Sequence, residues 1–69
     1  MTLGEYEKQI TGYTINMLNY EKEDTQDNIN FFKKDLEEED IKILKDKIIK
    51  NISFSKIKLQ LINNEIENR

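Results

Sequence analysis

The chain has 69 residues, enough for one small domain whose core is marginal, because so short a chain buries only about 60% of its extended surface. It contains no cysteine, histidine or proline, which excludes disulfides, thiolate metal sites, and the commonest zinc ligand and general base. Charged residues make up 36% of the sequence, and the formal net charge is −3.

The first element predicted is a helix from about residue 3 to residue 21. Thr2 and Glu5 have the spacing of a capping box, in which each side chain satisfies a free backbone amide at a helix start. Apolar and aromatic side chains then recur at alternating steps of three and four residues, which places them on one narrow helical stripe. The stripe consists of Leu3, Tyr6, Ile10, Tyr13, Met17 and Tyr20.

This stripe is our candidate protein-interaction site, because an isolated helix cannot offset its own conformational entropy and needs a second helix to cover it. The cover is either the C-terminal half of the chain or the same stripe on a second copy. Gly12 interrupts the stripe at a cost of about 1 kcal/mol relative to alanine. It marks either a tolerated weak point or a close approach of a partner backbone.

The second element predicted is an acidic connection over residues 21–28 that leads into a short helix at about 25–36. Asp24 or Thr25 would cap this helix, and Ile29, Phe32 and Leu36 would form its inward face. Asp35 with Glu38 offers another cap, so the sequence leaves open whether the helix breaks there.

The third element predicted is a C-terminal helix, or a pair of helices, at about 36–66, with residues 51–55 as the expected kink. Its stripe contains Ile41, Leu44, Ile48, Ile52, Ser55, Leu59, Ile62 and Ile66. The alternation of Ile57, Leu59 and Leu61 with polar residues also fits a strand, but no other segment alternates convincingly to pair with it.

Charge is distributed unevenly along the chain. Residues 21–40 hold nine acidic and three basic side chains, whereas residues 41–69 hold seven basic and three acidic ones. We therefore expect the acidic middle to fold back along Lys42–Lys58. Each exposed ion pair would contribute only about 0–1 kcal/mol, which biases the register of packing without holding the fold together.

No arrangement of residues predicts catalysis, a metal or a cofactor. The run Glu37–Asp40 points in several directions on a helix, and a favourable helix start explains it better than a cation site. Ser53 and Ser55 have no histidine to activate them. The Lys42–Lys58 segment lacks arginine and interleaved aromatics, so nucleic acid is not the expected partner.

Targeting signals are also missing. The first twenty residues lack a basic start and a continuous apolar run, and no stretch approaches the roughly 18 apolar residues of a membrane span. The expected location is cytoplasmic, with neither a membrane nor a small-molecule substrate as partner.

The opening Thr2-Leu3-Gly4-Glu5-Tyr6, followed by Gly12-Tyr13, resembles the start of small tail-assembly proteins of long-tailed bacteriophages. The similarity covers about a dozen residues, and the arginine-rich continuation of that family is not found after Tyr13. The resemblance implies a phage or prophage origin, a bacterial or phage-infected host cell, and a role as an assembly chaperone or adaptor. It transfers no functional residues.

Together these observations predict a single all-α domain over residues 1–69. The expected fold is a small helical hairpin or a three-helix bundle, either closed within one chain or completed by self-association. The expected function is a small non-catalytic protein–protein interaction module, an accessory or assembly adaptor that forms a homodimer or binds a larger protein. One alternative is an acidic inhibitor that mimics nucleic acid in the groove of a host enzyme. Another is nucleic-acid binding through Lys42–Lys58.

Overall fold

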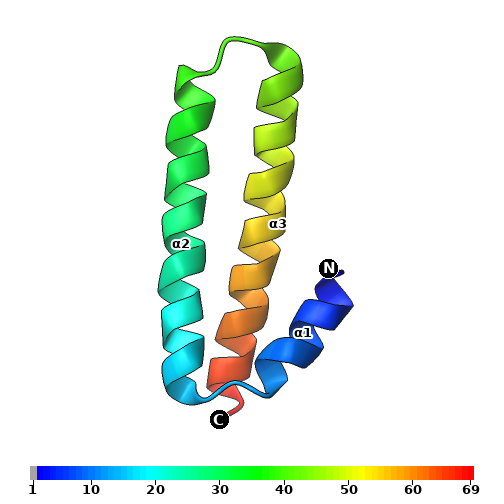
Figure 1. Ribbon diagram of the computed structural model, residues 1–69, viewed down its shortest axis with the longest axis vertical. Helices are drawn as coiled ribbons and strands as arrows, with labels where there is room; N and C mark the ends of the chain where they lie inside the picture. Colours follow the sequence, from blue (N-terminus) through cyan, green and yellow to red (C-terminus); the bar gives the residue numbers. More distant parts are fainter. Residues whose placement is uncertain (1) are drawn as a thin grey trace.

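The computed structural model describes residues 2–69, which form three helices and no strand. These are α1 (Leu3–Thr11), α2 (Ile15–Glu38) and α3 (Lys42–Glu67). Figure 1 shows α2 and α3 as a long antiparallel hairpin, with α1 beside the end of α3 that carries the C-terminus. The predicted all-α class is confirmed.

The first helix is shorter than predicted, since the expected helix over 3–21 is broken at residues 12–14. The Thr2 hydroxyl accepts the Glu5 amide at 3.2 Å, so the predicted start is correct. Thr14 then adopts an extended conformation and its hydroxyl accepts the Met17 amide at 3.2 Å, which starts α2. This second cap lets the chain turn, so that α1 folds back onto α3 instead of continuing the stripe.

The predicted acidic connection over 21–28 is wrong, because these residues lie inside the continuous helix α2. Thr25 does not cap a helix but is buried in its middle, and Asp35 caps nothing, since α2 runs on to Glu38. The predicted inward face is confirmed: Ile29 is buried, and Phe32 and Leu36 are half-buried.

The C-terminal half is one helix rather than two, and the strand alternative is wrong. α3 begins at Lys42 and continues without interruption through residues 51–55, where a kink was expected. The Glu39 carboxylate accepts the amides of Asp40 and Ile41 at 3.1 Å, and this satisfies backbone donors in the turn between α2 and α3.

The core has two parts. Along the hairpin, Ile48 and Ile52 of α3 are buried, as is Ile29 of α2. Near the C-terminus, α1 adds two side chains to a separate cluster. That cluster contains Tyr6, Ile10, Leu18 and Ile62. Of the predicted α3 stripe, Ser55, Leu59 and Ile66 are half-buried, whereas Ile41 and Leu44 are exposed near the turn.

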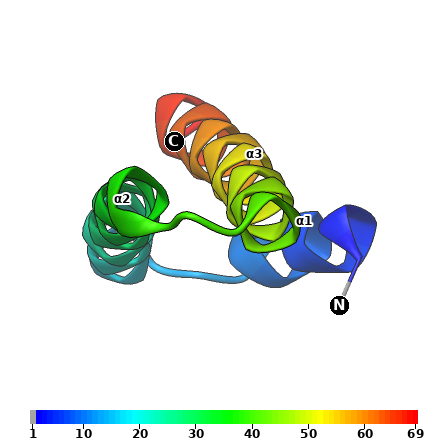
Figure 2. The ribbon, with the colours of Figure 1, turned by 90° about the horizontal axis from the view of Figure 1, so that it is seen from above.

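The molecule is elongated. Its principal extents are 42 × 20 × 15 Å, with a radius of gyration of 13.5 Å against about 11 Å for a compact domain of this length. Figure 2, seen from above, shows that α1 lies against one side of the hairpin only. The accessible surface of 5220 Å² exceeds the roughly 4,600 Å² expected for a compact monomer of this mass. The chain therefore leaves unusually much of itself uncovered.

Candidate functional site

The predicted interaction stripe is divided by the turn at residues 12–14. Tyr6 and Ile10 are buried in the core, and Leu3 and Tyr13 are half-buried. Beyond the turn, Met17 is 48% exposed and Tyr20 is 70% exposed, whereas their neighbour Leu18 is fully buried. The structure therefore does not bring the six residues together: the first part of the stripe belongs to the core and the last part lies on the surface.

Tyr6 fixes α1 onto both helices of the hairpin. Its phenol donates a hydrogen bond to a Glu21 carboxylate oxygen of α2 at 2.9 Å. The Lys58 ammonium of α3 lies 4.6 Å from the centre of the Tyr6 ring and 5.7 Å from that of Phe54. Burial raises the pKa of the Tyr6 phenol well above its ordinary value of 10.0, and the hydrogen bond to Glu21 and its negative charge raise it further.

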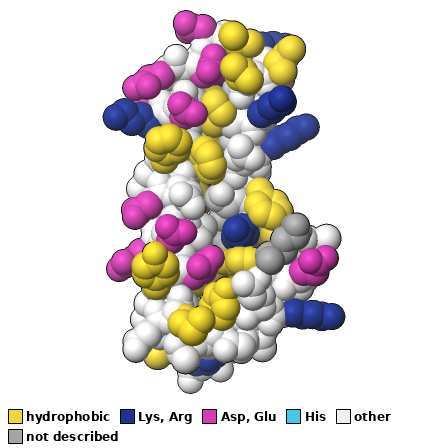
Figure 3. All heavy atoms as spheres, in the orientation of Figure 1, with side chains coloured by type: hydrophobic (Ala, Val, Ile, Leu, Met, Phe, Trp, Pro, Cys, Tyr) yellow, Lys and Arg dark blue, Asp and Glu magenta, His cyan; other side chains and the backbone are white. Residues whose placement is uncertain are grey.

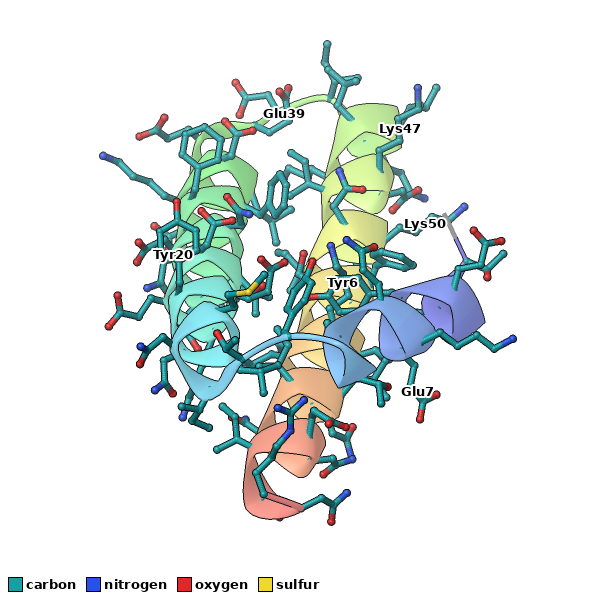
Figure 4. All side chains as sticks on the ribbon, turned by 60° about the horizontal axis from the view of Figure 1, so that its bottom comes forward. Tyr6, Glu7, Tyr20, Glu39, Lys47 and Lys50 are labelled. Carbon is teal, nitrogen blue, oxygen red and sulfur yellow. The ribbon has the colours of Figure 1, made fainter. Side chains whose placement is uncertain are left out.

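The side of the hairpin on which α1 packs is called the α1 face below. On α2, the alternation of three- and four-residue steps continues beyond Tyr20 and ends at the exposed Phe31. This outer α2 stripe consists of Met17, Tyr20, Asp24, Asp27 and Phe31. At its lower end lies a shallow pocket of about 300 Å³, lined by Tyr13, Asn16, Met17, Tyr20 and Glu21. Figure 4 shows Tyr20 on α2 and Tyr6 between the helices.

A second stripe, on α3, borders the same face. It consists of Leu44, Lys47, Asn51, Phe54 and Lys58, again at steps of three and four. The contact of Lys58 with Tyr6 shows that this stripe points to the α1 side. Phe31 and Phe54 were not among the predicted site residues. Phe31 could have been found from the sequence, because the steps of three and four residues from Leu3 to Tyr20 continue to Phe31 if the stripe includes the acidic residues at 24 and 27.

Most acidic side chains lie toward the α2 side of this face and most basic ones toward the α3 side, although Figure 3 also shows a basic side chain at the left edge and an acidic one at the right edge. α2 carries seven acidic and three basic residues, and α3 carries six basic and three acidic ones. The ion pairing expected between these segments is not formed, however. Within residues 2–69 the only pair within 4.0 Å joins Arg69 to Glu65 at 2.9 Å, and both belong to the C-terminal end of the chain.

The acidic run Glu37–Asp40 is divided between two helix ends. Glu37 and Glu38 lie in the last turn of α2, where carboxylates are repelled by the partial negative charge, so the predicted favourable helix start is wrong for these two residues. Glu39 and Asp40 precede α3, and the Glu39 carboxylate accepts the amides of Asp40 and Ile41, so the prediction holds for this end of the run. The exposed Ile41 and Ile43 lie beside these charges.

Other kinds of site find no support in the part of the chain that the structure describes. No group of three or more acidic side chains there could hold a metal ion. No helix in that part is long and apolar enough to cross a membrane. The six lysines of Lys42–Lys58 lie on one continuous helix at steps that spread them around it. No family model, curated protein or solved structure matches this chain.

Proposed function

We propose that the protein is a small non-catalytic protein–protein interaction module that binds its partner through the α1 face. One observation carries this proposal: α2 has two stripes at helical spacing, and the chain covers only one of them. The inner stripe, with Leu18 and Ile29, packs against α3. The outer stripe leaves Tyr20 and Phe31 70% and 66% exposed.

The free energy of apolar burial favours covering the outer α2 stripe with the surface of another protein. Burial of a large apolar side chain contributes about 1.5–3 kcal/mol, so covering Met17, Tyr20 and Phe31 would supply a useful part of a binding free energy. Aromatic side chains are also enriched among residues that dominate binding at interfaces. The Phe31 ring makes an edge-on contact with Phe32, with 6.1 Å between ring centres.

The more specific form of this proposal is an assembly chaperone or adaptor of a bacteriophage. It rests on the resemblance of residues 2–6 and 12–13 to tail-assembly proteins. In the fold, Thr2 caps α1, and Gly12 and Tyr13 begin the turn that separates α1 from α2. The resembling residues therefore include both ends of the element that defines the α1 face.

Photo-crosslinking tests the proposal directly. A photoreactive phenylalanine analogue replaces Tyr20 or Phe31 in the cells that produce the protein, and the same analogue replaces Ile49 as a control. Ile49 is also exposed, at 48%, but lies two residues from both Lys47 and Asn51 and is therefore separated from each by about 160° around α3. Protein adducts at positions 20 and 31 but not at 49 are expected. A lack of adducts at both, or equal adducts at all three positions, would contradict binding through this face.

A second candidate function, an acidic inhibitor of a nucleic-acid enzyme, is supported by the acidic side chains of α2, none of which forms an ion pair within residues 2–69. Reversal of Glu37, Glu38 and Asp40 to lysine should abolish inhibition while helicity is kept. Inhibition that survives the reversal would exclude charge mimicry by these residues.

A further inference from the structure

We infer that the partner on the α1 face is a second copy of this chain, related by a two-fold axis parallel to the long axis of the hairpin. This inference depends on the proposed function, since it requires the face to bind protein. In this arrangement α2 of each copy lies against α3 of the other, and the two helices run antiparallel.

Charge complementarity selects a second copy as the occupant. The α1 face carries Asp24 and Asp27 on its α2 edge, whereas Lys47 lies on the α3 stripe and Lys50 is three residues further. Figure 4 shows both lysines directed away from α2, so they do not approach its carboxylates within the chain. A partner that brings carboxylates to α3 and ammonium groups to α2 would satisfy both edges. A second copy turned face to face has this pattern.

The direction of the axis follows from the same charges. Rotation about an axis across the hairpin would set α2 against α2, with acidic side chains opposite one another. Rotation about the long axis instead sets α2 against α3, with opposite charges facing. Like charges across an interface are costly, so electrostatics excludes the first arrangement and favours the second.

The symmetry also fixes which residues meet, because a pure rotation about the long axis permits no sliding along it. Phe31 lies seven residues before the end of α2, and Ile49 lies seven residues after the start of α3, so both are at one height in the hairpin. Asp27 is likewise at the height of Ser53. Phe31 of one copy therefore lies level with the Lys47–Lys50 stretch of the other, and Asp27 lies within one helical turn of Lys50.

The outline of the molecule on this side is comparable in size with a standard interface. The two longer extents of the whole molecule are 42 × 20 Å, which outline about 840 Å² with α1 included. A standard interface buries about 800 Å² on each partner. The rotation also places α1 of one copy opposite the lower end of α2 of the other, where Tyr13, Met17 and Tyr20 line the shallow pocket.

The experiment measures the molar mass of the full chain by light scattering after size exclusion, over a range of concentrations. The wild-type protein should have twice the chain mass of 8.3 kDa. Asp24→Lys combined with Asp27→Lys should raise the dissociation constant by on the order of tenfold or more, and so should Lys47→Glu combined with Lys50→Glu. A chain with all four substitutions should recover the dimer, because opposite charges face again. Circular dichroism checks that each variant keeps its helices.

Single cysteines give a second measurement that does not depend on the charge variants, and the chain contains no other cysteine. A mixture of Asp27→Cys and Lys50→Cys chains should be joined by a short thiol-reactive crosslinker that spans neighbouring helices, and Asp27→Cys alone should not. For the molar-mass measurement, Ile49→Ser serves as the control variant. It removes an exposed apolar side chain outside the α1 face, so the molar mass of the dimer should be unchanged.

The outcomes separate this inference from the proposed function. A monomer at every concentration, a particle larger than a dimer, or a dimer that is insensitive to the charge reversals would overturn the two-fold arrangement. Crosslinks from positions 20 and 31 to a different protein would then still support the interaction module. If crosslinking at those positions also fails, both proposals are wrong.

Discussion

Replacing Leu18 or its neighbour Met17 by alanine distinguishes the structure from the uninterrupted stripe that the sequence favours. In the structure, Leu18 is fully buried against Tyr6, Ile10 and Ile62, whereas Met17 is half-exposed. Three carbon atoms are lost in Leu18→Ala, worth about 2.4 kcal/mol of transfer free energy, and the remaining cavity brings the total to about 3–4 kcal/mol. Met17→Ala should cost only about 0.5 kcal/mol.

The free energy of unfolding is measured by urea denaturation and circular dichroism at low micromolar concentration, where association contributes least. For a domain of this size, the loss at Leu18 corresponds to a fall of roughly 15–25 °C in the melting temperature. The loss in Leu18→Ala approaches the whole free energy of unfolding of a small domain. Leu18→Val should lower that free energy by only about 1 kcal/mol, so this variant remains folded and can be compared with Met17→Ala. If Met17→Ala proved as costly as Leu18→Ala, the turn at residues 12–14 would be wrong and the continuous helix correct.

Four further predictions concern local features. Because the folded protein raises the pKa of Tyr6, the unfolded chain releases the phenol proton first as pH rises above 10, so stability is complete below that pH and falls above it. The difference in urea midpoint between wild type and Tyr6→Phe should therefore shrink between pH 8 and pH 11, and a constant difference would contradict the Tyr6–Glu21 contact. Gly12 has an ordinary helical conformation with only normal contacts around an added Cβ, so Gly12→Ala should stabilise the fold by about 0.4–1 kcal/mol. Thr14→Ala should instead cost about 1 kcal/mol by removing the cap of α2, and thermal melts that ranked the two variants in the opposite order would refute both assignments. Glu38→Lys should raise stability by about 0.3–1 kcal/mol through the helix dipole, and a lower melting temperature would show that Glu38 has a partner.

The sequence predicted the helical class, the cap at Thr2 and part of the inward face of each long helix, namely Ile29, Phe32 and Leu36 of α2 and Ile48, Ile52 and Ile62 of α3, because periodicity of apolar residues reports which face is buried. It failed at the turn over residues 12–14. Tyr13 and Met17 continue the heptad spacing of Leu3 and Tyr6, so the pattern alone favours one straight helix. Only tertiary packing, in which Ile10 and Leu18 enter the same cluster, gains enough to offset the interruption.

The acidic segment was misread for a related reason. Residues 21–28 contain no apolar side chain and so resemble a connection, yet Glu21 and Thr25 face the seam and the Tyr6 phenol binds Glu21. Polar residues at inward positions leave no signal in a hydrophobic pattern. The candidate face was partly predictable, since Tyr20 was recognised, but Phe54 belongs to it only because α3 passes beneath α1.

The docking of α1 has a consequence for synthesis on the ribosome. Its contacts lie at the far end of the chain, where Ile62 completes the cluster around Ile10 and the Arg69 guanidinium donates to the Thr11 carbonyl at 2.9 Å. Those residues leave the exit tunnel long after α1 has emerged. α1 therefore cannot reach its place in the fold until they emerge, and its apolar side chains are exposed to chaperones during that interval.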